Sequence, residues 1–176
     1  MATPLHRTAT EGRATLVTAP PFGFEDFFEE EHPRLFAALC LTTRSRLEAE
    51  EISQEAFVRI FERWDRVAAM EHPAGYLHRT AMNLFRKRYR RARFVEHLPI
   101  PSDQGTDAFG AVDDRDVLVR ALRDLTPQQR AAVVLTAILD HSSEDAGRML
   151  GISASTVRVL ARNARTAMRT KMGDIA

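Results

Sequence analysis

The chain has 176 residues, of which 44% are hydrophobic and 28% charged, and its formal net charge is +1. This composition is typical of a soluble globular protein that forms one domain or two small ones. The single cysteine excludes an intramolecular disulfide and a cysteine-rich zinc module, and the six histidines stand at no metal-ligand spacing. No apolar run approaches the roughly 20 residues of a membrane span, and no signal sequence begins the chain. We therefore expect a cytoplasmic protein without membrane insertion, metal or cofactor.

The first part of the chain predicts a tail and then a helix. Residues 1–21 mix Thr, Ala, Pro and Gly without any period, which predicts a disordered tail. Several phenylalanines follow, and a helical pattern continues through HPRLFAALCL. Because Pro33 lacks an N–H and normally interrupts a helix, we expect this helix to start at or just before His32.

A second helix is expected from Leu47 to Arg66, with one broad apolar arc that contains Ile52 and Phe57. The opposite side carries four residues that fall in one row or next to it: Glu51, Gln54, Glu55 and Val58. An acidic face of this kind is often simply solvated. An apolar valine among carboxylates also suits a docking surface for a basic partner.

Residues 67–75 contain Pro73 and Gly75 and predict a loop. Trp64, His72 and Tyr76 flank this loop, and rings of this kind commonly stack on unpaired bases. Most tryptophans in small helical domains are core anchors, so Trp64 taken alone favours a core position.

The stretch from Tyr76 to Arg93 carries seven Lys or Arg and no acidic residue, and its apolar residues lie on the opposite helical face. One polar stripe contains five residues at helical spacing: Arg79, Asn83, Arg86, Arg90 and Arg93. Guanidinium groups match phosphate oxygens and base edges geometrically, so this helix predicts nucleic-acid binding without distinguishing DNA from RNA.

Residues 95–113 are rich in Pro, Gly, Ser and Asp and predict a linker. Helical character then resumes near Asp114. Thr126 and Pro127 fit the N-cap and first position of one helix, and Ser142 or Ser143 caps a short helix after it. The tight turn at residues 151–153 then leads to a final helix, which completes a helix-turn-helix pattern.

The final helix divides into two stripes. The inward stripe consists of Val157, Leu160, Ala161, Ala164 and Met168, and the outward one of Arg158, Arg162, Arg165 and Arg169. A recognition helix needs this division between an apolar back and basic side chains that face DNA. No arrangement of nucleophile, base and orienting group is visible, so we expect no catalysis.

These residues together resemble the bacterial RNA polymerase sigma factors of the extracytoplasmic-function (ECF) type, in the sigma-70 family. The resemblance rests on AEEISQEAFVRIFERW, YLHRTAMNLFRKRYRR, LTPQQRAAVVL and SSEDAGRMLGISASTVR, which occur in the family's order and spacing. It implies an all-α fold of two small helical domains joined by a flexible linker. Region 2 would span residues 22–94, and the region 4 helix-turn-helix would span residues 114–172.

The resemblance also implies roles for the residues singled out above. The acidic helix would dock on the clamp helices of the largest polymerase subunit through Glu51, Gln54, Glu55 and Val58, and the polymerase flap would be a further contact. The minus-ten element would be melted and bound by Trp64, His72, Tyr76, Arg79, Asn83, Arg86 and Arg90. The minus-thirty-five element would be bound by Ser155, Thr156, Arg158, Arg162 and Arg165. An anti-sigma factor is an expected partner beside core polymerase and promoter DNA.

The chain departs from the family pattern at several positions. Lys87 stands where an Asp is usual, Arg86 and Arg88 stand where apolar residues are common, and Leu160 replaces an Arg. Gly147 replaces the usual alanine, which should cost about 1 kcal/mol of helix propensity. Two alternatives remain: a conventional helix-turn-helix regulator that binds operators without polymerase, and an interaction protein whose basic helix binds RNA or an acidic protein.

Overall fold

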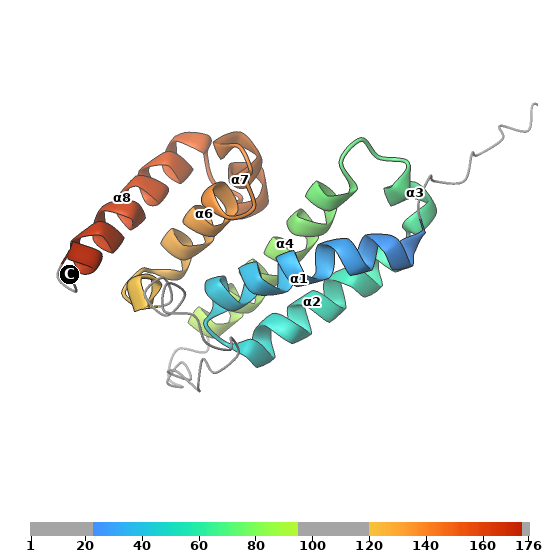
Figure 1. The fold of residues 1–176 in the computed structure, drawn as a ribbon, viewed down its shortest axis with the longest axis horizontal. Helices are drawn as coiled ribbons and strands as arrows, with labels where there is room; N and C mark the ends of the chain where they lie inside the picture. The colour runs from blue at the N-terminus through green and yellow to red at the C-terminus, as the bar shows by residue number, and fades with distance from the viewer. Residues whose placement is uncertain (1–22, 95–119, 174–176) are drawn as a thin grey trace, which may run out of the picture.

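The computed structural model describes residues 23–94 and 120–173, which form helices and connecting turns without any strand (Figure 1). The N-terminal half comprises α1 (Phe24–Thr43), α2 (Arg46–Phe61), the short α3 (Trp64–Ala68) and α4 (Pro73–Phe94). The C-terminal half comprises α6 (Pro127–Ala137), α7 (Ser143–Leu150) and α8 (Ala154–Gly173), and residues 120–123 before it are also helical. The all-α prediction is confirmed. The predicted tail at residues 1–21 and the linker at 95–113 lie outside the described residues.

The expected start of the first helix near His32 is wrong, because α1 already begins at Phe24 and contains Pro33 in its interior. Proline removes one helical hydrogen bond, the one that would reach the carbonyl of Glu29. Both Pro33 and Glu29 are exposed, so water can solvate that carbonyl. The turn before the proline is also held by packing, since Phe27 is buried against the rings of Phe57 and Trp64.

The predicted helix from Leu47 to Arg66 is two helices in the structure. Arg63 leaves helical geometry with φ −130° and ψ 23°, which separates α2 from α3. The predicted loop at residues 67–75 is correspondingly shorter, because Pro73 opens α4 and Gly75 lies inside that helix. Proline suits a first helical turn, whose N–H groups have no intrahelical partner.

The turns of the C-terminal half follow the predicted capping chemistry. Thr126 accepts from the backbone N–H of Gln129, and Ser142 accepts from that of Asp145 at 3.0 Å. Gly151 ends α7 with φ +65°, in the left-handed region that favours glycine. The helix-turn-helix prediction is therefore confirmed in its local geometry.

Gly147 has a steric role that its low helix propensity does not convey. A Cβ at this position would lie 2.8 Å from the backbone oxygen of Ile152 and 3.2 Å from the backbone nitrogen of Ala154. The absence of a side chain lets α7 approach the turn before α8. The expected propensity cost is thus offset by this close packing.

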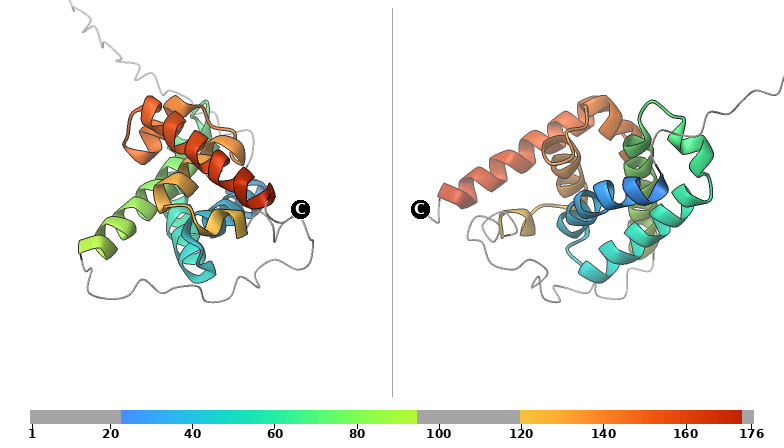
Figure 2. Two further views of the ribbon diagram at one scale, coloured as in Figure 1. Left: turned by 90° about the vertical axis from the view of Figure 1, so that its left-hand side faces the viewer. Right: turned by 45° about the vertical axis from the view of Figure 1, so that its right-hand side comes forward.

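The helices of the two halves pack directly on each other (Figure 2). They share one continuous buried cluster. Helix α6 contacts α1, and α7 contacts α4. The guanidinium of Arg130 in α6 is buried in this joint and donates to the carbonyls of Thr42 at 3.1 Å and Leu125 at 2.6 Å. Burial away from water, together with nearby Arg44, lowers the pKa of Arg130 to about 10.

Candidate nucleic-acid and partner interfaces

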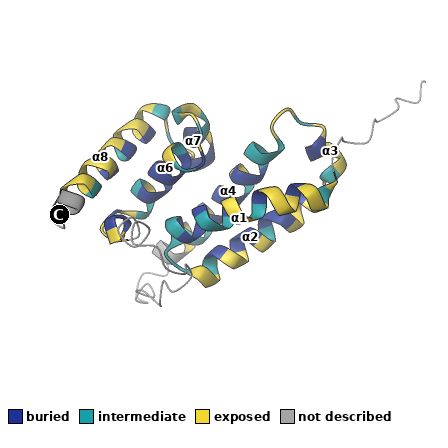
Figure 3. Ribbon diagram, in the orientation of Figure 1, coloured by how far each residue is buried: buried dark blue, intermediate teal, exposed yellow. Residues whose placement is uncertain are grey.

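Helix α2 has one face on the surface (Figure 3). On this acidic face Glu51, Gln54 and Val58 are exposed and Glu55 is half-buried. Val58 is 56% exposed, so the valine in this acidic row does face solvent. The structure therefore brings all four predicted polymerase-contact residues onto one accessible surface.

Two of these carboxylates already have partners within the chain. Arg88 of α4 forms ion pairs with Glu51 and with Glu55, the latter at 3.5 Å. Arg59 also bonds Glu55, at 2.7 Å. The pairing raises the pKa of Arg88, chiefly through its hydrogen bond to Glu51. The basic and acidic helices are thus joined by an exposed charge network.

An apolar groove of about 660 Å³ lies beside Val58, between α1 and α2. Phe28 and Phe61 line it and are 38% and 58% exposed. The aromatic cluster below it includes Trp64, whose ring centroid lies 5.4 Å from that of Phe24 and 5.1 Å from that of Phe27. Exposed rings beside carboxylates form an amphipathic surface that extends the acidic face.

The predicted minus-ten stripe on α4 is divided between solvent and the joint. Arg79, Asn83 and Arg90 are exposed, whereas Arg86 is half-buried. Arg86 donates to the Met149 carbonyl of α7 at 3.4 Å and lies over Gly151. Helix α7 therefore covers part of this arginine row.

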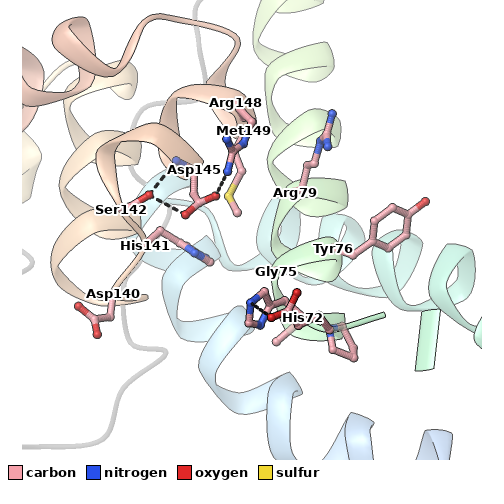
Figure 4. Close-up of a pocket in the computed structure, with 13 residues that line it drawn as sticks. His72, Gly75, Tyr76, Arg79, Asp140, His141, Ser142, Asp145, Arg148 and Met149 are labelled. Carbon is pink, nitrogen blue, oxygen red and sulfur yellow. Dashed lines mark hydrogen bonds and ion pairs between the residues drawn. The ribbon is translucent and has the colours of Figure 1, made fainter. Parts of the chain in front are cut away.

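A second cavity, of about 580 Å³, lies between the start of α4 and the turn before α7 (Figure 4). His72, Tyr76 and Arg79 line one side, and His141, Ser142, Asp145, Arg148 and Met149 line the other. The structure thus brings three of the seven predicted minus-ten residues, His72, Tyr76 and Arg79, to one cavity. Trp64 does not line this cavity, and its ring packs in the phenylalanine cluster.

Exposed residues run along the outer face of α8 (Figure 3). All five predicted minus-thirty-five residues are exposed. They are Ser155, Thr156, Arg158, Arg162 and Arg165. The inward stripe is buried at Val157, Ala161 and Ala164, so the predicted division of this helix is confirmed. Ser153 caps α8, accepting from the backbone N–H of Thr156 at 3.1 Å.

Arg158 is paired across the helix-turn-helix, since it bonds Glu144 of α7 at 3.0 Å. A backbone hydrogen bond and this pairing both lower the pKa of Glu144. Both side chains are exposed, so the pair is weak.

The sequence patterns missed two exposed or bridging side chains on these faces. Val159 is 47% exposed on α8, one turn after Ser155, and its helical position alone could have indicated this. Arg88 stands out in the sequence only as a departure from the family pattern, whereas in the structure its bond partners lie on α2. No local pattern connects residues that are 37 positions apart.

Within residues 23–94 and 120–173, no three His, Cys, Asp or Glu side chains are arranged to hold a metal ion. None of the helices in that part of the chain is long and apolar enough to cross a membrane.

A helix-turn-helix with a basic outer face, next to a second basic helix on a separate helical half, defines a DNA-binding transcription protein. Comparisons with known proteins specify the family. Residues 27–95 match the family model of Sigma-70 region 2, and residues 115–168 match that of Sigma-70, region 4.

Individual relatives agree with these two matches. The chain is 30% identical over 152 residues to the RNA polymerase sigma-E factor of Streptomyces avermitilis, covering 85% of this chain and 84% of the relative. It is 30% identical over 157 residues to the RNA polymerase sigma factor CarQ of Myxococcus xanthus, covering 86% and 90%. It is 27% identical over 168 residues to the ECF RNA polymerase sigma factor SigM of Mycobacterium tuberculosis, covering 95% and 86%.

The fold also has a solved counterpart, the sigma factor RpoE of Bartonella quintana in complex with the anti-sigma factor NepR. The TM-score is 0.68 at 22% identity, and the match covers 85% of this chain and 96% of the other. The chain belongs to the ECF group of the sigma-70 family. It is a sigma factor that directs transcription from promoters, so its partners are core RNA polymerase and promoter DNA, and the conventional regulator is not favoured.

Proposed function

We propose that this sigma factor contacts core polymerase through the exposed face of α2 and reads two promoter elements through α4 and α8. The observation that carries this assignment is the exposed position of Val58 among the carboxylates of α2. A solvated acidic face has no need of an apolar side chain. A basic partner helix would use both the charges and the valine, and the neighbouring apolar groove would extend that contact.

For the minus-ten element we propose a division of labour along α4. Arg79, Arg86 and Arg90 would contact the phosphate backbone, and Asn83 would read a base edge, since an amide can form a bidentate pair with adenine. His72 and Tyr76 at the start of α4 would hold an unstacked base in the cavity that they line. We assign Trp64 a supporting role, because its ring packs against Phe24 and Phe27.

For the minus-thirty-five element we propose that α8 enters the major groove with its N-terminal residues toward the bases. Ser155 and Thr156 are exposed in the first turn, and Arg158, Arg162 and Arg165 follow on the outer face. An N-terminal approach of a recognition helix is the usual docking geometry of a helix-turn-helix.

The expected mode of DNA opening, location and regulation follow from membership of the sigma factor family. The protein would open DNA by capturing an unstacked base, without hydrolysing any bond, and would act in the cytoplasm. Its release would be regulated by an anti-sigma factor, by analogy with the Bartonella protein.

The polymerase contact can be tested by measuring the affinity of the full chain for core polymerase. The variant that combines Glu55→Arg with Val58→Asp reverses one charge and removes the apolar contact, and we expect at least a tenfold loss of affinity. Glu30→Arg repeats the charge reversal of Glu55→Arg on the exposed side of α1 and is the matched control. Equal affinities of the double variant and the wild type would refute the α2 assignment.

A further inference from the structure

Two histidines meet inside the joint between the halves. The Nδ1 atom of His78 in α4 lies 2.8 Å from Nε2 of His141, in the turn between α6 and α7. On its other side, Nε2 of His78 lies 3.4 Å from Oε2 of Glu31 in α1. The side chains of His78 and Glu31 are 3% and 11% exposed. A chain of three titratable groups thus connects both halves; His78 and Glu31 are buried, and the half-buried His141 lines the cavity beside them.

The 2.8 Å contact can hold only one proton. Two neutral rings satisfy it, since one nitrogen donates and the other accepts, and a single imidazolium also satisfies it. If both rings are protonated, two N–H groups face each other and two positive charges meet in the joint. Glu31 can balance one of these charges but not both.

Other charged groups surround His141 on every packed side. They are Glu31 and Arg34 from α1, His78 and Arg79 from α4, Asp140 beside it, and Asp145 and Arg148 from α7. Burial lowers the pKa of His141 from its ordinary value of 6.5, and His78 and Arg34 lower it further against the opposing effects of Asp145 and Asp140. Because the closed joint disfavours the charged ring, the closed form is favoured above about pH 6.5 and loses stability as the pH falls below that value.

The closed arrangement conflicts with the use of both promoter elements at once. Elements centred about 25 base pairs apart are separated by roughly 85 Å at 3.4 Å per base pair. In the structure α7 contacts both α4 and α8, so the two DNA-facing helices lie within roughly two helix diameters, about 20 Å, of each other. Arg86, one of the proposed minus-ten contacts, is also held under α7.

We infer that the His78–His141 pair, backed by Glu31, is an acid-sensitive latch. It keeps the free sigma factor closed, with Arg86 held under α7 and with α4 and α8 too close together to reach both promoter elements. Protonation of the second ring opens the joint, which frees Arg86 and lets the halves reach separate DNA sites. The consequence for DNA rests on the proposed function of α4 and α8, but the opening itself does not.

Opening can be measured without DNA or polymerase, by small-angle X-ray scattering of the full chain between pH 7.5 and pH 5.0. We expect the radius of gyration to increase as the pH falls below about 6.5, with the ratio of open to closed protein rising up to about tenfold per pH unit. Helical circular dichroism should stay constant across this range. Loss of helicity in parallel with expansion, or no expansion at pH 5.0, would overturn the latch.

Two substitutions fix the charge of the latch in opposite senses. His141→Gln keeps a neutral hydrogen-bonding group and should stay compact at pH 5.0, whereas His141→Arg should be expanded already at pH 7.5. His72→Gln removes an exposed histidine at the rim of the same cavity and should leave the midpoint of expansion unchanged. Expansion of His141→Gln with the wild-type midpoint would also overturn the proposal.

The wild-type protein offers a second measurement if a variant fails to fold. The imidazole of His141, followed by NMR, should titrate with the same midpoint as the expansion, and separate midpoints would contradict the latch. The proposed function of α4 and α8 would fail separately from the latch, if the protein does not direct transcription from any promoter.

Discussion

Replacement of Arg88 by glutamine should weaken the folded protein slightly and at the same time strengthen its binding to polymerase. Arg88 pairs with Glu51 and Glu55, two carboxylates that we assign to the polymerase contact. Its side chain is 33% exposed and those of its partners 52% and 40%, so solvent screens the pairs. Exposed pairs of this kind are typically worth up to about 1 kcal/mol in total stability.

That small free energy opposes polymerase binding, because the intramolecular pairs must break before a partner can use the carboxylates. Arg88→Gln should therefore lower the free energy of unfolding by about 0.5–1 kcal/mol. It should raise the affinity for core polymerase by about two- to fivefold, the equivalent of the same free energy. Urea unfolding measures the first quantity, and fluorescence anisotropy with core polymerase in the absence of DNA measures the second.

Lys87→Gln provides the matched control, since it makes the same chemical change at the neighbouring exposed position. It should change neither quantity by a comparable amount. A lower or unchanged core affinity of Arg88→Gln would refute the reasoning, because it would mean that Glu51 and Glu55 do not face polymerase.

Three further predictions follow from single contacts. Asn83→Ala should lose base preference in the minus-ten element by about 1–3 kcal/mol in a competition assay with permuted promoters, and an unchanged preference would contradict the base-reading role. Gly147→Ala should lower stability by about 1 kcal/mol in thermal unfolding, because the close contact of the new Cβ with the Ile152 oxygen outweighs the gain in helix propensity. A more stable variant would contradict the steric role of Gly147. The polar contact with His78 lowers the pKa of Glu31, so the Glu31 carboxylate stabilises the fold above about pH 4.5, and this stabilisation is lost as the pH falls further. Glu31→Gln should therefore reduce the pH dependence of the free energy of unfolding, measured in urea, in this acid range. An unchanged pH dependence would exclude this contribution of Glu31.

Local chemistry made much of the fold predictable. Thr126 and Ser142 cap helices with their own side chains, and Gly151 adopts a backbone angle that few other residues tolerate, so each signal acts within a few residues. The two stripes of α8 were likewise readable, because helical spacing alone separates the buried face from the exposed one.

Errors arose where distant packing overrides local preference. Pro33 is tolerated inside α1 because aromatic contacts hold the turn before it, and those contacts come from α2 and α3. No proline or glycine marks the break between α2 and α3 at Arg63 in the sequence.

The joint between the halves could not be read from the sequence for a related reason. Arg130 bonds a carbonyl 88 residues away, and His78 meets a histidine 63 residues away. Buried polar side chains such as these do not contribute to the apolar periodicity that marks a core face. In the sequence, their positions therefore look like ordinary surface positions.

Run-off transcription with purified core polymerase and a library of genomic fragments tests whether this protein directs initiation and whether the α2 face is needed for it. We expect initiation at defined start sites only when this protein is added, with loss of that activity in the Glu55→Arg, Val58→Asp variant and retention in Glu30→Arg. Absence of initiation from every fragment, with a protein that is folded and free to bind core, would contradict it.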